Sequence, residues 1–162
     1  MRKAFCLMLM AALMLGSAMA QTDKYKAPYN PKADAMYQLD SAIDLARKEG
    51  KYVVAQVGYN KCPWCIMFNQ YKDTNEVVHK IVEENFVWVH INYNAENRNP
   101  EAMMRLANPA RFGFPVLVIL NEKGEPIHIQ NSAYLEEGRG YNQKKVADCL
   151  LNWTPKAVKT LK

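Results

Sequence analysis

The sequence predicts an α/β fold in which a mixed central sheet is covered by helices on both faces, with an extra helix on the N-terminal side. Two observations support this fold class. Apolar, β-branched segments alternate with segments whose apolar residues recur at helical spacing, which is typical of parallel strands joined by helices. Farther along the chain, a turn at residues 121–124 separates two strand-like segments and predicts an antiparallel hairpin at one edge of the sheet.

The first predicted elements are a helix, a strand and a second helix. Residues 33–49 carry apolar side chains at helical intervals: Met36, Leu39, Ile43 and Ala46. Gly50 is expected to end this helix, because glycine readily adopts the left-handed conformation found at helix ends. Residues 52–57 are β-rich and predict a strand. The next helix is expected to begin near Pro63 and to extend to about Tyr71.

A helix, a strand and a short helix are predicted in the middle of the chain. Asp73 or Thr74 can cap a helix over residues 75–84. Its inner face is expected to consist of Val77, Val78, Ile81 and Val82. Residues 86–92 predict a strand, and Asn99-Pro100 predicts a short helix that ends at Leu106, because proline is favoured at the first helical position.

The last predicted elements are the hairpin and a closing helix. Residues 116–120 form the most apolar strand-like run, and residues 127–130 are expected to pair back with it after a turn that contains Gly124. Residues 141–153 predict a helix with a basic tail behind it. Its apolar residues recur at helical spacing, so we interpret Cys149 as part of the core rather than as a redox group.

Residues 1–20 have the pattern of a cleavable signal peptide. Arg2 and Lys3 form a basic region, residues 4–15 are apolar, and residues 18–20 form a small-x-small cleavage site. The apolar run is shorter than the about 20 residues that span a membrane, and no other segment qualifies. We therefore expect a periplasmic or secreted protein without a membrane span in the mature chain.

The remaining chain is long enough for one domain with a substantial core. The mature protein is expected to start at Gln21, with an extended lead-in over residues 21–32 and the domain over residues 33–162. The formal net charge of the whole chain is +5, and two of these charges belong to the signal peptide. The basic excess is mild and forms no stripe, so we expect no nucleic-acid partner.

Cys62 and Cys65 are the candidate catalytic residues. At this spacing on the first turn of a helix, both thiols lie on one face and can form a disulfide. Pro63 suits the first helical position, so Cys62 should lie at the helix N-terminus, where unpaired N–H groups and the macrodipole favour a thiolate. We expect Cys62 to be the nucleophile and a shielded Cys65 to resolve the mixed disulfide.

Other interpretations of the cysteine pair are weaker or remain open. A structural zinc site needs four ligands, but no second pair of this kind occurs, and His79, His90 and His128 are scattered. Haem attachment requires a histidine after the second cysteine, whereas the residue there is Ile66. A permanent structural disulfide remains possible in an exported protein. We expect no metal and no small-molecule cofactor, since the disulfide itself stores two electrons.

Several features occur together in a pattern typical of one family: Gly50-Lys51 before a strand, the dithiol after it, Phe114-Pro115 before the strand at residues 116–120, and the Gly124 hairpin. Together they resemble the thioredoxin superfamily over residues 33–153, and the long leading helix is similar to that of exported bacterial thioredoxin-like proteins. The resemblance implies a thiol-disulfide oxidoreductase that acts on exported protein thiols and disulfides and is recharged by a redox partner. It also implies a cis Phe114–Pro115 bond beside the dithiol, which leaves the backbone of residue 114 free to pair with a substrate.

The chain departs from the family pattern around the dithiol. Pro63-Trp64 replaces the usual Gly-Pro, and we expect Trp64 to be exposed and to contact partners. Lys61 replaces a tryptophan; it either favours the Cys62 thiolate or is simply solvated. The family's buried acid falls on Gln56, which cannot titrate, so deprotonation of Cys65 would rely on water or another group. The segment at residues 93–112 is longer than the corresponding segment of a minimal thioredoxin. We interpret it as a packing insertion rather than as part of a partner groove.

These observations leave several functions open. The leading one is an exported enzyme that exchanges disulfides with protein substrates, and Pro63-Trp64 suggests a less reducing couple than thioredoxin. The alternative is a binding module that keeps the fold and uses Cys62-Cys65 as a structural staple. A third is a dedicated partner in the maturation of one exported metalloprotein.

Overall fold

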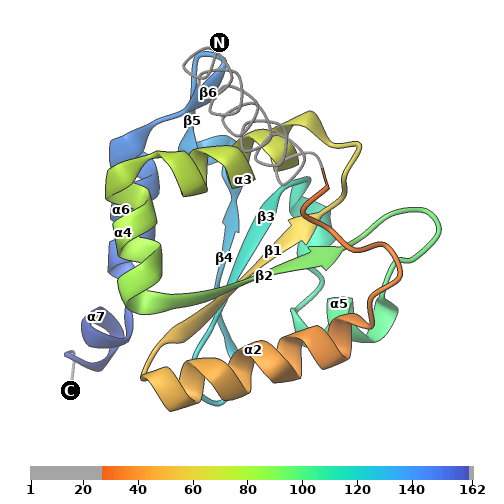
Figure 1. Cartoon of the computed structure of the whole chain (residues 1–162), viewed down its shortest axis with the longest axis horizontal. Helices are drawn as coiled ribbons and strands as arrows, with labels where there is room; N and C mark the ends of the chain where they lie inside the picture. Colours follow the sequence, from red (N-terminus) through yellow and green to blue (C-terminus); the bar gives the residue numbers. More distant parts are fainter. Residues whose placement is uncertain (1–26, 161–162) are drawn as a thin grey trace, which may run out of the picture.

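The computed structural model describes residues 27–160 and contains a four-stranded mixed sheet (Figure 1). The strand order is β2-β1-β3-β4. Strand β1 (Tyr52–Gly58) runs parallel to β2 (Phe86–Asn92) and antiparallel to β3 (Val116–Leu120). Strand β4 (Pro126–Asn131) pairs antiparallel with β3. The predicted mixed sheet with its hairpin edge is therefore confirmed.

Helices cover both faces of this sheet (Figure 1). One face is covered by α2 (Ala35–Glu49) and α5 (Pro100–Arg105). The other is covered by α3 (Pro63–Thr74), α4 (Glu76–Asn85) and α6 (Gln143–Asn152). The smaller elements are α7 (Pro155–Lys159), the 3-10 helices η1 (Pro109–Phe112) and η2 (Ser132–Leu135), and the paired strands β5 (Glu136–Glu137) and β6 (Gly140–Tyr141). The expected signal peptide and residues 21–26 of the lead-in lie outside the described residues.

Strand β1 lies at the centre of the molecule and is buried along its whole length. Because side chains alternate along a strand, Val53 and Ala55 pack with α2 on one face, whereas Tyr52 and Val54 pack with α4 on the other. This double coverage explains why the strand reads as a continuous apolar run. It also places the end of β1, where the cysteines follow, against both layers.

Helix α2 begins and ends with specific caps. The Asp34 side chain accepts hydrogen bonds from the backbone N–H groups of Met36 and Tyr37, and therefore the helix starts two residues later than predicted. Gly50 adopts φ = 69°, as expected for a residue that ends a helix.

The boundary between α3 and α4 differs from the prediction. Asn75, and neither Asp73 nor Thr74, caps α4, with its side-chain oxygen accepting from Val78 N at 3.1 Å. The two predicted caps are engaged elsewhere: Asp73 pairs with Lys72, and the Thr74 hydroxyl donates to Gln70 O at 2.9 Å. Helix α3 consequently continues to Thr74.

Two side chains in the covering helices lie differently from the simplest interpretation of the pattern. Val77 is 46% exposed, because the inner face of α4 is narrower than the four residues predicted for it. Cys149 is half-buried against the core, and its thiol contacts Gln130 Oε1 at 3.5 Å. Burial raises the pKa of the Cys149 thiol to about 11, so this residue stays protonated at neutral pH.

The chain beyond the predicted closing helix is not a simple tail. Helix α7 follows α6, and Thr154 caps it through a hydrogen bond from Ala157 N. Within residues 27–160, no helix is both long and apolar enough to cross a membrane.

Candidate active site

Cys62 and Cys65 form a disulfide at the junction of β1 and α3, with their Cα atoms 5.2 Å apart. Cys62 is the N-cap of α3, and its sulfur accepts a hydrogen bond from Cys65 N at 3.2 Å. Pro63 is the first helical residue. The predicted placement of the pair at a helix N-terminus is therefore confirmed, and the same N–H group that contacts Sγ here can stabilise a thiolate.

The two cysteines differ in accessibility. Cys62 keeps 6% of its surface exposed, whereas Cys65 has none. An external sulfur can therefore reach the pair only at Cys62. This is the order expected of a nucleophile and a resolving thiol.

The Phe114–Pro115 peptide bond is cis, as the family resemblance implied. Its loop lies beside the dithiol, since Cys62 Sγ is 3.8 Å from Phe114 O. The Phe114 ring packs edge-on against Tyr59 at a centroid distance of 5.7 Å. The backbone of residue 114 thus lies next to the reactive sulfur, where a bound chain could pair with it.

Gln56 occupies a fully buried position behind Cys65. Its side-chain nitrogen donates to the Tyr29 hydroxyl at 2.6 Å and to Cys65 O at 3.3 Å. Its side-chain oxygen accepts from Trp88 Nε1 at 3.1 Å. The amide is therefore held at both ends, and it positions neighbouring groups without gaining or losing a proton.

Tyr29 is the site residue that the sequence did not reveal. It lies in the segment expected to be only an extended lead-in, yet it is 1% exposed. Asn60 holds its backbone with two hydrogen bonds, one accepted from Tyr29 N at 3.0 Å and one donated to Tyr29 O at 2.8 Å. The only sequence hint is an aromatic residue between two prolines, a pattern too common to identify a site.

The Tyr29 hydroxyl and the Cys65 sulfur both lie close to Gly58. A Cβ atom at Gly58 would lie 2.7 Å from each of them, so glycine is required for both groups to reach this place. Burial raises the pKa of Tyr29, and the hydroxyl therefore keeps its proton. Because it accepts its hydrogen bond from Gln56, its own hydrogen is available to a second acceptor.

His90, on β2, packs against the buried Tyr29 ring. Its ring lies edge-on to the Tyr29 ring at 5.3 Å, and Nε2 is 2.9 Å from Asn69 Oδ1. Burial, with a smaller contribution from Lys72, lowers the pKa of His90 to about 4. The imidazole is therefore neutral at physiological pH, so no cation lies behind Cys65 at this position.

The remaining predicted site residues lie around the mouth of the site. Trp64 is half-buried rather than exposed, because its ring packs against Tyr141 at 5.7 Å and the Tyr141 hydroxyl donates to its carbonyl. Lys61 is exposed. The segment at residues 93–112 serves two purposes: its middle packs Met103 and Leu106 into the core, and its first residues line a cavity beside the dithiol.

These features define the class: a thioredoxin-fold domain with a surface-reachable disulfide, a cis proline and a helix N-terminus at one site. Residues 34–122 match the model of the thioredoxin-like family. The chain belongs to this family.

One solved structure supports the fold. The chain is similar to the disulphide isomerase from Xylella fastidiosa Temecula1, with a TM-score of 0.68 and 22% sequence identity over 78% of this chain and 95% of that one. A thioredoxin from Thermus thermophilus is more distant, with a TM-score of 0.48 and 18% identity over 78% of this chain and 89% of that one.

Curated relatives share only a short region. Spermatogenesis-associated protein 20 of Mus musculus is 38% identical over 61 residues, and the Homo sapiens protein is 38% identical over 63. These regions cover 38% and 39% of this chain, but it spans only 8% of the length of either relative.

Proposed function

We propose that this protein is a thiol-disulfide oxidoreductase that exchanges disulfides with exported protein substrates through Cys62 and Cys65. One observation carries the proposal: the pair forms a disulfide at a helix N-terminus, beside a cis proline, with only the first cysteine reachable. Membership of the thioredoxin-like family supports the same chemistry.

In the reducing direction, the Cys62 thiolate attacks one sulfur of a client disulfide. The client S–S bond breaks, the other client sulfur leaves as a thiolate, and a Cys62–client disulfide forms. The Cys65 thiolate then attacks Cys62 Sγ and releases the second client thiolate. The two electrons of the protein dithiol have passed to the client, and the protein retains its own disulfide. In the oxidising direction the same steps run backwards.

Cys65 must therefore be a thiolate in both directions, as attacking group or as leaving group. Gln56 cannot accept the proton, which passes instead to a leaving client thiolate or to water. We assign to the Tyr29 hydroxyl the task of donating a hydrogen bond to the Cys65 thiolate, which lowers the pKa of that thiol. Its position close to Gly58, where the Cys65 sulfur also lies, and its free hydrogen support this role.

Client recognition in this proposal uses the groups around Cys62. The backbone of Phe114, ahead of Pro115, pairs with an extended client segment, and the exposed part of Trp64 contacts it. A recharging redox partner would reach the disulfide at the same place. The direction of net electron flow depends on the potential of the couple and on that partner.

Alkylation and trapping together test the function. The reduced protein should be alkylated rapidly at Cys62 near pH 6, and Cys65→Ala should accumulate mixed disulfides with exported proteins. The matched control is Cys149→Ala, which should trap none. Slow labelling at pH 6 without trapped clients would instead indicate a binding module with a structural disulfide, whereas a single trapped client would indicate a dedicated maturation partner.

We also propose that the protein is exported and works in the periplasm or outside the cell. The support is the pattern of residues 1–20, with its basic, apolar and small-residue regions. Cell fractionation with mass spectrometry of the purified protein tests this. The expected result is an extracytoplasmic protein that begins at Gln21, and a cytoplasmic chain that retains Met1 would contradict it.

A further inference from the structure

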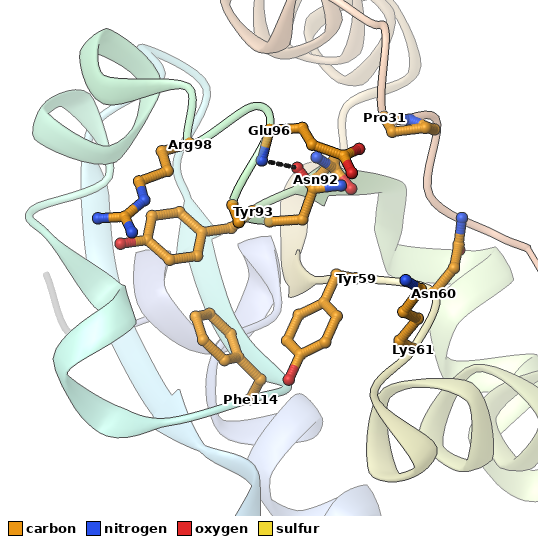
Figure 2. Close-up of a pocket in the computed structure, with 11 residues that line it drawn as sticks. Pro31, Tyr59, Asn60, Lys61, Asn92, Tyr93, Glu96, Arg98 and Phe114 are labelled. Atoms are coloured by element: carbon orange, nitrogen blue, oxygen red, sulfur yellow. Dashed lines mark hydrogen bonds between the residues drawn. The ribbon is translucent and has the colours of Figure 1, made fainter.

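A cavity of about 610 Å³ lies close to the dithiol, and Figure 2 shows the residues that line it. Four parts of the chain line it: Pro31, the loop from β1 to α3, the end of β2 with the chain that follows it, and Phe114. Phe114 connects it to the chemistry, because its carbonyl oxygen is the atom 3.8 Å from Cys62 Sγ. Lys61, which precedes Cys62, also lines the cavity, so the residues next to a cysteine bound at Cys62 are the part of a client placed to reach it.

Aromatic rings form one wall of the cavity. The Phe114 ring is 5.7 Å from that of Tyr59 and 5.3 Å from that of Tyr93, and all three side chains are only half-buried (Figure 2). Rings left partly open in this way offer a surface for another ring or a large apolar side chain.

The charge of the cavity lining favours an acidic occupant. Lys61 and Arg98 both line it and are exposed, and neither forms an ion pair within residues 27–160. Glu96 is the only acidic side chain of the lining, so cations exceed acids there. Water screens these exposed charges, and they therefore act as a preference rather than as a requirement.

We infer that this cavity binds the segment of a client polypeptide that flanks its reactive cysteine, and that it prefers an aromatic side chain followed by an acidic one. The aromatic side chain packs on the rings of Tyr93 and Phe114, and the carboxylate lies near Arg98. The inference rests on the proposed function, because it assigns substrate preference to the same dithiol.

The test uses Cys65→Ala protein and symmetric peptides in which a central cysteine carries a coloured thionitrobenzoate leaving group. The flanks are Asp-Phe, Lys-Phe or Ala-Ala on both sides, so the binding direction need not be known. Cys62 attacks the peptide sulfur, the S–S bond to thionitrobenzoate breaks, and its release reports the rate. We expect the Asp-Phe peptide to react about tenfold faster than the other two.

Two variants, each made in the Cys65→Ala background, locate the preference. Arg98→Glu should abolish or invert the preference for Asp-Phe over Lys-Phe, and Tyr93→Ala should reduce the advantage of the Asp-Phe peptide over the Ala-Ala peptide. Lys123→Glu is the matched charge reversal, because the turn after β3 lies at the opposite end of the sheet from the dithiol. It should keep the full preference.

Other results would overturn the inference. Equal rates for all three peptides would show that the cavity makes no contact with the flanks. A glutathione mixed disulfide that reacts as fast as the Asp-Phe peptide, with the same dependence on Arg98, would assign the cavity to a small anionic thiol. The mixed disulfide of 2-mercaptoethanol distinguishes failure of this inference from failure of the proposed function. If Cys62 does not react even with this neutral compound, the proposed function itself is wrong.

Discussion

Gln56 and Tyr29 show how the groups beside the resolving cysteine can differ from the family pattern while the proposed reaction stays the same. The family's buried acid is replaced by Gln56, and a hydroxyl from a different part of the chain lies next to Cys65 instead. A carboxylate can take the proton of the resolving thiol, whereas a phenol with a raised pKa can only donate a hydrogen bond to the thiolate. The two arrangements therefore predict different pH profiles.

Removal of the Tyr29 hydroxyl should slow the resolving step. In Tyr29→Phe the ring stays but the Cys65 thiolate loses its proposed donor, so we expect the resolving step to require a higher pH than in the natural protein. At neutral pH, release of a trapped client should slow by about tenfold or more, as measured by stopped-flow. Alkylation of Cys62 should hardly change. Tyr37→Phe, at a residue 73% exposed, is the control; an unaltered pH profile of resolution in Tyr29→Phe would refute the assignment.

His90 should make stability depend on pH. Its pKa is about 4 in the folded protein and 6.5 in the unfolded chain, so between these values the unfolded state binds more protons. The free energy of unfolding should therefore rise by about 2 kcal/mol from pH 4 to pH 6.5 and then level off. Urea unfolding across this range measures it.

The variant His90→Gln isolates this contribution. It should unfold with a flatter pH dependence than the natural protein, while His79→Gln, on α4, should behave like the natural protein. An equally steep slope in His90→Gln would assign the pH dependence to other groups.

At the scale of elements, most boundaries follow from local chemistry. The helix stop at Gly50 and the start at Pro63 agree with the prediction, because a left-handed glycine and an N-terminal proline act on their own neighbours. The α3–α4 junction does not agree with the prediction, because the choice of cap depends on which polar side chain is not already engaged by another group. Asp73 is paired with Lys72, and this left Asn75 to cap α4.

Substitution of this cap tests the interpretation. Asn75→Ala removes the acceptor for Val78 N, and we expect a loss of about 1 kcal/mol in the free energy of unfolding. Thr74→Ala, the neighbouring residue that the sequence also offered as a cap, should cost clearly less. Thermal and urea unfolding of both variants provide the comparison, and equal losses would mean that Asn75 has no special capping role.

At the scale of the whole molecule, the redox potential reflects the difference in stability between the dithiol form and the disulfide form. The helix N-terminus favours the Cys62 thiolate and so the reduced form, and Pro63-Trp64 replaces the usual Gly-Pro between the cysteines. We therefore expect a potential less negative than the roughly −270 mV of thioredoxin.

Equilibration of the purified protein with glutathione measures this potential. The double variant Pro63→Gly, Trp64→Pro should move it to a more negative value, and a shift of about 30 mV corresponds to about 1.4 kcal/mol. Cys149→Ala should leave it unchanged, because this thiol lies outside the site. A natural protein with a potential at or below that of thioredoxin would contradict the expectation.

The sequence by itself determined the features that depend on residues close together in the chain. Spacing placed both cysteines on one helical turn, and periodicity gave the strands and helices of the mixed sheet. The cis bond before Pro115 came from the family pattern, since a lone proline would have predicted trans.

Only the tertiary structure decided what surrounds the sulfurs. Tyr29 is far from Cys65 in the chain, and Tyr93 and Phe114 come from different segments, so no local pattern could bring them together. Packing also buried half of Trp64, whose exposure depended on Tyr141. Burial, pKa shifts and unpaired atoms arise when distant segments exclude water from the same place, and for that reason they become visible only in the folded molecule.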